Sequence, residues 1–199
     1  MNETSKIRHT PTIGLLLALA LAACSGSSEA PPLEGAAIGG PFTLTDQDGR
    51  TVTERDYAGR FRIMYFGFTH CPDICPTDLA VLGQALRRFE KSDPDRAARV
   101  VPIFVSVDPQ RDTPAVLKEY VAAFHPRLVG LTGTPKQVAD TVRGYGAYGE
   151  KGDPQAGGGY NVNHSRLAEL IGPAGEPIAL LPYDKGAEAV AAELDRWVE

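Results

Sequence analysis

The sequence predicts an α/β fold, in which a mixed central sheet is flanked by helices and preceded by an N-terminal β-hairpin. Two continuous apolar runs of strand length, residues 62–68 and 100–107, indicate strands that are covered on both faces. The amphipathic stretch between them, from about 76 to 90, predicts a helical crossover, so the two strands should pair in parallel. A second hairpin near the C-terminus predicts antiparallel strands in the same sheet.

Turn, capping and periodicity signals place the other elements. Residues 144–159 contain repeated glycines and are expected to form a mobile loop. Pro114 suits the first turn of one helix, and Thr134 with Gln137 forms a capping box that opens another. In chain order, the predicted elements are a hairpin of 42–45 and 50–53, a helix of about 113–124, a short strand of 128–131, a helix of about 134–143, a hairpin of 166–171 and 178–181, and a helix of 187–197.

The composition is that of a folded domain. Of 199 residues, 43% are hydrophobic and 23% are charged, which excludes a disordered chain, a collagen-like repeat and a polytopic membrane protein. The 20 Lys and Arg residues against 25 Asp and Glu give a formal charge of -5, and no stretch clusters the basic residues. Binding to nucleic acid, which needs such clusters to neutralise phosphates, is therefore not expected.

The N-terminal segment has the pattern of an export signal. Lys6 and Arg8 precede the apolar run 13–23, which as a helix would span about 16 Å, against about 30 Å for a bilayer core. The run ends in Leu-Ala-Ala before Cys24, which resembles a bacterial lipobox, so Cys24 is expected to be acylated. The alternative is an ordinary cleaved signal followed by an incidental cysteine.

These signals predict the organisation of the chain. The predicted parts are a lipoprotein signal peptide of 1–23, a flexible tether of 24–40 rich in Ser, Gly, Pro and Ala, and a domain of 41–199. The protein is expected to be a membrane-anchored lipoprotein outside the cytoplasm, facing the periplasm. That compartment allows a cysteine pair to cycle between dithiol and disulfide.

The pair Cys71 and Cys75 lies where the first central strand passes into its helix, the end of a strand at which α/β sheets place redox and ligand sites. A spacing of four brings both thiols to one side of a helical turn. With Pro76 at the first helical position, Cys75 would be the N-cap, where the helix dipole favours a thiolate. The alternative is a pair of structural cysteines or an inert disulfide.

A histidine is the candidate third ligand. His9 leaves with the signal, His125 is expected to end a helix, and His70 points elsewhere if its loop is extended. His164 precedes the C-terminal hairpin, and the predicted sheet allows it to reach the cysteines. Two thiolates and an imidazole suit Cu(I) and Cu(II), and zinc can use the same set with an open fourth position. From the residues alone, ligation by His164 depends on the fold.

Three segments resemble the Sco/SenC family of thioredoxin-fold proteins, which help to mature the binuclear copper centre of cytochrome c oxidase. The resemblance covers about 36–199, and its most specific segments are GFTHCPDICP at 67–76, SVDPQRDTP at 106–114 and NHS at 163–165. It implies a thioredoxin-like (peroxiredoxin-like) fold with Cys71, Cys75 and His164 as copper ligands. It further implies delivery of copper to subunit II of cytochrome c oxidase, with an upstream periplasmic donor.

The chain departs from the family pattern at two positions. Asn163 stands where the family commonly has Asp, and Glu169 where it often has tyrosine, so metal affinity or redox poise is expected to differ from that of relatives. Asp108, Arg111 and Asp112 follow the second central strand on the rim of the cysteines. They are expected to form a local ion pair and helix cap, with contact to the metal site or to a partner as the alternative.

Two other activities remain open at this point. A thiol-disulfide reductase that keeps the acceptor's cysteines reduced would use Cys71 and Cys75 and would not need His164. A peroxiredoxin-like peroxidase fits less well, because Thr69 stands one residue too close to the first cysteine for the Thr-x-x-Cys spacing.

Overall fold

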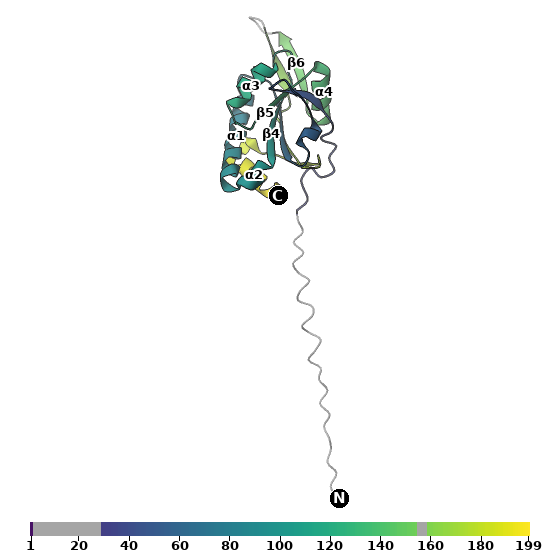
Figure 1. Cartoon of the computed structure of the whole chain (residues 1–199), viewed down its shortest axis with the longest axis vertical. Coiled ribbons are helices and arrows are strands. Elements are labelled where there is room, and N and C mark those ends of the chain that lie inside the picture. Colours follow the sequence, from purple (N-terminus) through teal and green to yellow (C-terminus); the bar gives the residue numbers. More distant parts are fainter. Residues whose placement is uncertain (2–28, 155–158) are drawn as a thin grey trace. The chain divides into compact units, whose positions relative to one another are not determined.

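The computed structural model describes residue 1, residues 29–154 and residues 159–199. The unit Pro31–Glu199 is built on a seven-stranded mixed sheet with the order β2-β1-β5-β4-β3-β8-β9, and a separate two-stranded sheet pairs β6 with β7 (Figure 1). The strands are β1 (Thr43–Asp46), β2 (Thr51–Thr53), β3 (Phe61–Gly67), β4 (Val100–Ser106), β5 (Val129–Thr132), β6 (Gly149–Pro154), β7 (Tyr160–His164), β8 (Ala168–Ile171) and β9 (Pro177–Leu180).

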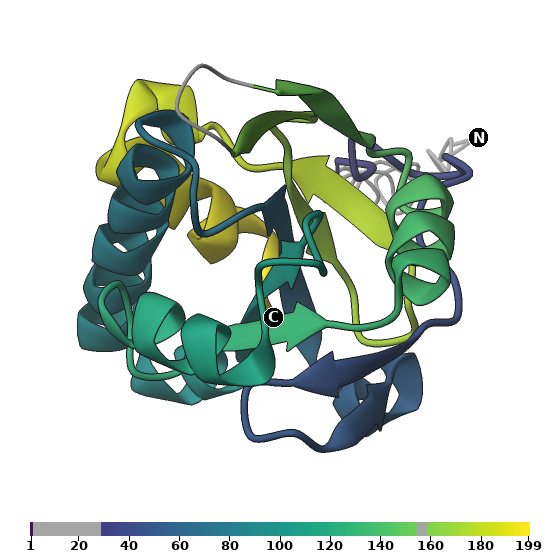
Figure 2. The same cartoon turned by 90° about the horizontal axis from the view of Figure 1, so that it is seen from above.

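Helices cover both faces of the large sheet (Figure 2). On one face, Phe104 of β4 contacts Tyr120 of α3, and Tyr65 of β3 bonds to Asp78 of α1. On the other face, Phe66 packs against the ring of Tyr145, which follows α4. The helices are α1 (Ile74–Ser92), α2 (Pro94–Ala98), α3 (Pro114–Ala122), α4 (Pro135–Gly144) and α5 (Ala187–Trp197), with 3-10 turns η1 (Glu54–Tyr57) and η2 (Tyr183–Lys185).

The strand pairing confirms the predicted mixed sheet. β3 and β4 are buried along their whole length and pair in parallel, while β8 joins β3 in the antiparallel direction. Gly67 at the end of β3 lies opposite Ser106 at the end of β4. The loops that follow these two strands therefore leave the same edge of the sheet, and the candidate site forms there.

The structure corrects part of the predicted mobile loop at 144–159, of which 155–158 lie outside the described residues. Residues 149–154 and 160–164 are the strands β6 and β7, which form an antiparallel hairpin. Only Val162 is buried among the described residues of these two strands, so the apolar alternation that reveals a half-buried strand is absent. The hairpin forms through pairing and docking rather than through local propensity.

Helix α1 begins earlier than predicted. Asp73 is its N-cap and Ile74 its first residue, so Cys75 is the second helical residue and not the cap. Pro76 falls at the third position, where it is tolerated because that N–H has no partner inside the helix.

The N-terminal predictions are only partly covered by the structure. The predicted signal peptide of 1–23 lies outside the described residues except for Met1, and Cys24 also lies outside them. In the predicted tether, the Leu33 N–H donates to the Ile178 carbonyl at 3.0 Å and the Gly39 N–H to the Gly144 carbonyl at 2.9 Å, so this range contacts the domain. Within the described part of the chain, no helix has the length and apolar character needed to cross a membrane.

Candidate metal centre

The structure brings the three predicted ligands together. Cys71 lies in the loop after β3, Cys75 in the first turn of α1, and His164 at the end of β7. Their ligand atoms lie within 4.8 Å of one another, and His164 Nε2 is 3.4 Å from Cys75 Sγ. Neither Cys71 nor Cys75 is in a disulfide, so both sulfurs are free to bind.

The two sulfurs differ in their surroundings. The N–H of Cys75, in the first turn of α1, donates to Cys71 Sγ at 3.3 Å. Cys75 is fully buried, and this burial raises the pKa of its thiol to about 12. The expectation of an N-cap thiolate at Cys75 is corrected in two ways: Cys75 is not the cap, and its loss of hydration outweighs the hydrogen bond with the Phe68 backbone that lowers its pKa.

The ring of His164 is oriented for ligation. Its Nδ1 is 2.8 Å from the carbonyl oxygen of Ser165. A carbonyl can only accept, so Nδ1 carries the proton and the lone pair of Nε2 points toward the cysteines. The edge of the ring also packs on Phe68, with ring centroids 5.6 Å apart and planes at 83°.

The donor set fits copper. Two sulfurs suit Cu(I) and the nitrogen helps to accommodate Cu(II), while three ligands leave a coordination position open. A groove of about 360 Å³ runs past Cys71 and His164 to solvent, with Pro72, Ile74 and Tyr148 in its lining. An incoming ligand can therefore reach the ion.

An ion pair between Asp78 and Arg166, which was not predicted from the sequence, connects the segments that carry Cys75 and His164. Asp78, one turn after Cys75, is buried and accepts hydrogen bonds from Arg166 Nε at 3.0 Å and Nη2 at 2.7 Å. The Tyr65 hydroxyl donates to the same carboxylate at 3.0 Å. The signal in the sequence was a carboxylate beside the apolar stripe of a helix, on the same side as Cys75.

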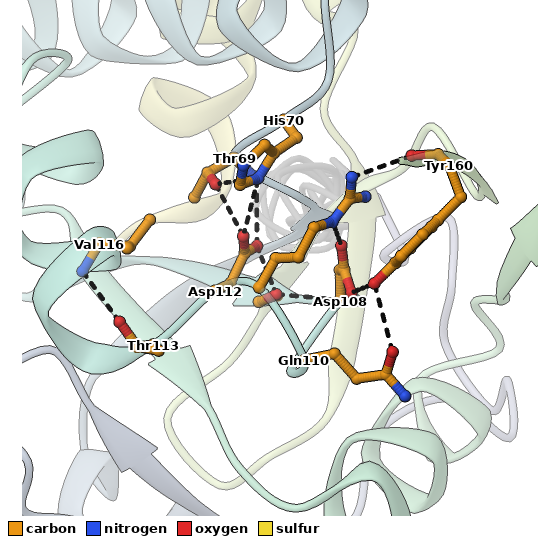
Figure 3. A network of polar contacts seen from close by, with 10 residues as sticks. Thr69, His70, Asp108, Gln110, Asp112, Thr113, Val116 and Tyr160 are labelled. Carbon is orange, nitrogen blue, oxygen red and sulfur yellow. Dashed lines mark hydrogen bonds and ion pairs between the residues drawn. The ribbon is translucent and has the colours of Figure 1, made fainter. Parts of the chain in front are cut away.

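Figure 3 shows where the structure places the charged residues predicted on the rim. Asp112 is fully buried beside Thr69, and Asp108, also buried, lies beside Tyr160. Arg111 pairs with Asp108, as the prediction of a local ion pair requires. The helix cap is not among them, since Thr113 is the N-cap of α3.

Other candidates lie apart from the three ligands. The exposed His70 bonds to Thr69 and has its Nδ1 3.7 Å from Asp112 Oδ1, so it belongs to the rim. Asn163 is exposed and lines the groove. Glu169 is buried in β8, which lies between β3 and the edge strand β9 of the large sheet.

Comparisons with known proteins agree with this geometry. The SCO1/SenC family profile matches residues 30–199. The mitochondrial SCO1 homolog 1 of Arabidopsis thaliana is 45% identical over 145 residues, which cover 73% of this chain and 42% of that protein. The chain spans about half the length of the curated relatives it matches.

Solved structures give the same relationship. Bradyrhizobium japonicum ScoI with copper bound is 40% identical, with a TM-score of 0.72 over 80% of this chain and 99% of that chain. The thioredoxin domain of a Bacteroides vulgatus thiol-disulfide oxidoreductase is only 16% identical, with a TM-score of 0.58 over 81% of this chain and 96% of that chain. This second likeness concerns the fold alone and confirms the thioredoxin-like prediction. With a family match over nearly the whole described domain, the chain belongs to the SCO1/SenC family.

Proposed function

We propose that this protein binds one copper ion through Cys71, Cys75 and His164 and delivers it to subunit II of cytochrome c oxidase during oxidase assembly. The observation that carries the proposal is the convergence of two sulfurs and an imidazole nitrogen within 4.8 Å, from segments about ninety residues apart. BsSco, a member of the Sco family, is a cytochrome c oxidase assembly protein, and ScoI of Bradyrhizobium japonicum binds copper.

The residues of the site suit transfer better than storage. The open groove lets a thiolate or imidazole of the acceptor approach the ion while the protein's own ligands still hold it. Exchange of one ligand at a time would pass the ion on without exposing it to water. Cys71 is only half-buried, so an acceptor ligand that approaches from solvent meets this sulfur before the buried Cys75.

We further propose a location for this activity. Acylation of Cys24 would hold the protein at a membrane outside the cytoplasm, facing the periplasm, where an upstream copper donor and the oxidase subunit are accessible. Relatives are found at comparable places, since the Arabidopsis protein is mitochondrial and a Bacillus anthracis family member is a lipoprotein.

The unequal burial of the two sulfurs also favours a second candidate, a thiol-disulfide reductase. The half-buried Cys71 would attack a disulfide of the acceptor, forming a mixed disulfide and releasing one acceptor thiolate. The buried Cys75 would then attack Cys71, which forms the Cys71–Cys75 disulfide and releases the second acceptor thiolate. Two electrons pass to the acceptor, and a dithiol reductant must restore the pair.

Anaerobic titration with Cu(I), and separately with Cu(II), tests the copper proposal. Wild type should bind one ion per chain, with spectra showing sulfur and nitrogen coordination. Cys71→Ser and Cys75→Ser should each lose the sulfur signature, and His164→Ala should weaken binding by roughly 100-fold or more, because a ligand contributes at least as much as its supporting residues. Unchanged copper binding in His164→Ala would remove that residue from the site.

Oxidase assembly in cells separates the two functions. If delivery is the function, all three variants should fail to support assembly. If His164→Ala supports assembly while either cysteine variant does not, the reductase is the better account. Copper titration of the same variants shows whether His164→Ala has lost its affinity for copper.

Gly67 provides a test of how tightly the cysteine is placed. A Cβ at this position would lie 2.8 Å from Cys75 Sγ and 3.0 Å from ring atoms of Tyr65 and Phe104. Gly67→Ala should therefore displace the sulfur, weaken Cu(I) binding about 10-fold and lower the free energy of unfolding by about 1 to 3 kcal/mol.

Competition titration of Cu(I) and denaturant unfolding measure the two effects. Gly144→Ala is the matched control, because its new Cβ would meet its nearest neighbour at an ordinary 3.5 Å. Wild-type copper affinity in Gly67→Ala would show that the sulfur can shift without cost to the site.

A further inference from the structure

The loop of residues 106–113 contacts both halves of the metal centre. It leaves the end of β4 and reaches the cysteine loop on one side and the β6–β7 hairpin on the other (Figure 3). We call it the bracket loop.

Asp112 makes the first connection, between the bracket loop and the cysteine loop. This carboxylate is fully buried, and it accepts from the Thr69 N–H at 3.0 Å, the Thr69 hydroxyl at 2.7 Å and the Ser106 hydroxyl at 2.6 Å. Thr69 stands two residues before Cys71. Asp112 therefore fixes the start of the cysteine loop against the end of β4.

A cluster around Tyr160, four residues before His164, makes the second connection, between the bracket loop and the β6–β7 hairpin. The Tyr160 hydroxyl donates to Asp108 at 2.7 Å, and Arg111 donates to the Tyr160 carbonyl at 2.9 Å. The Arg111 guanidinium and the Lys151 ammonium lie 3.8 and 3.9 Å from the centroid of the tyrosine ring. This cluster holds the described part of the hairpin to the bracket loop.

A close backbone packing contact and a cation–π contact complete the connection. Gly149 at the start of β6 lies so close to Val107 that an added Cβ would be 2.7 Å from the valine Cβ. Arg111 also lies 5.7 Å from the centroid of Phe68, the ring on which His164 packs. The bracket loop thus touches the hairpin at both strands and reaches the ring behind the histidine.

We infer that the bracket loop sets the separation between the thiols and the imidazole, with Asp108, Arg111, Asp112 and Tyr160 as positioning residues. The inference rests on the proposed copper site and deepens it. Asp108 and Asp112 are 4% and 0% exposed, and each of their four carboxylate oxygens already accepts a hydrogen bond within the domain. These two buried carboxylates leave no free oxygen for a partner protein. This argues against the alternative that Asp108 and Asp112 form a docking contact.

Tyr160 allows the hairpin side to be tested in steps. Tyr160→Phe removes the hydroxyl bond to Asp108 but keeps the ring between Arg111 and Lys151, whereas Tyr160→Leu removes both. We expect the Cu(I) dissociation constant to rise about threefold in Tyr160→Phe and about 10-fold or more in Tyr160→Leu, with loss of the nitrogen signature only in the latter. Tyr57→Phe, whose ring packs on Phe42, is the matched control.

Thr69 tests the cysteine side. Thr69→Val deletes the hydroxyl bonds to Asp112 and to the exposed His70, and leaves the shape and the backbone bond of the residue intact. We expect an approximately threefold weaker Cu(I) affinity with the nitrogen signature preserved, because the histidine side stays fastened. Thr132→Val is the matched control, since the buried Thr132 hydroxyl has no hydrogen-bond partner among the described residues.

Amide hydrogen exchange of the metal-free proteins provides a readout that does not depend on copper. Tyr160→Leu should speed exchange in β6 and β7 at least 10-fold, with α1 unchanged. Unchanged exchange in the hairpin would overturn the inference, and so would fast exchange with wild-type copper affinity and spectrum. Normal copper binding with impaired delivery alone would also overturn it, because that is the pattern of a docking contact.

If wild type itself fails to bind copper, the proposed function fails. In that case exchange in the hairpin still reports whether the bracket loop holds it.

Discussion

Replacing Asp78 with alanine is expected to lower the free energy of unfolding by about 2 to 3 kcal/mol and to weaken copper binding in the same protein. Asp78 is buried, and its loss leaves the Tyr65 hydroxyl without its acceptor and the Arg166 guanidinium without its partner. The energy is below that of a fully buried ion pair because the side chain of Arg166 is 47% exposed.

The expected loss of copper affinity follows from the positions of Asp78 and Arg166 in the chain. Asp78 follows Cys75 by three residues on α1, and Arg166 follows His164 by two, so their ion pair ties the helix of one ligand to the segment of another. Without it, the histidine side of the site keeps the bracket loop, the pairing of its strand and the packing of His164 on Phe68. We expect a loss of Cu(I) affinity of about 10-fold.

A double-mutant cycle isolates the pair. Asp78→Asn, Arg166→Met and the double variant should give a coupling energy of about 1 to 2 kcal/mol in denaturant unfolding. The control is the exposed pair Arg143 and Asp140, for which Arg143→Met should change stability by less than about 0.5 kcal/mol. A coupling energy near zero for Asp78 and Arg166, with wild-type copper affinity, would show that the two segments are held together by other contacts.

The arrangement of the ligands could be predicted because it follows from topology. Apolar runs that are long enough for strands identified β3 and β4, and a helix between them required parallel pairing. That pairing puts Cys71 and the bracket loop at one edge of the sheet. His164 could be placed there only through the family resemblance and the structure, since its strand β7 has no clear alternation.

The features that could not be predicted from the sequence are those that depend on tertiary contacts. The burial of Cys75, which decides the direction of its pKa shift, is made by β3 and α1 together and cannot be seen in a spacing of four. Tyr160 stands in a segment rich in glycine and asparagine, where a single tyrosine gives no sign of its two cationic neighbours. In the same way, no capping side chain marks the start of α1 at Ile74, because Asp73 at the N-cap position makes no side-chain hydrogen bond to the helix.

The second large effect is expected from Glu169, whose carboxylate should make the protein less stable as the pH rises. Glu169 is fully buried in β8, opposite Met64 of β3, and neither carboxylate oxygen has a hydrogen-bond partner among the described residues. Burial without a partner raises the pKa of this carboxyl to about 8. On the same face of the sheet, Arg62 and the Tyr145 hydroxyl are its ionisable neighbours, and Arg62 forms no ion pair with it.

The direction of the pH dependence follows from linkage. In the unfolded chain the carboxyl ionises near its ordinary pKa of 4.5, whereas the folded protein keeps the proton until about pH 8. The contribution of Glu169 is therefore fully present below pH 4.5 and is lost as the pH rises through 8. At 1.36 kcal/mol per unit of pKa, the loss across this window is roughly 5 kcal/mol.

Substitution of Glu169 should remove this slope. Urea unfolding between pH 4.5 and 8.5 should show a falling free energy in wild type, a flatter profile in Glu169→Gln, and the highest stability at pH 8.5 in Glu169→Leu, which buries no polar group. Glu119→Gln, which removes an exposed carboxylate of α3, is the matched control. Because Glu169 is not one of the three clustered ligands, copper stoichiometry should stay at one per chain in all three variants. A wild-type profile as flat as that of Glu169→Gln would mean that the carboxylate gains a partner, such as Arg62, when it ionises.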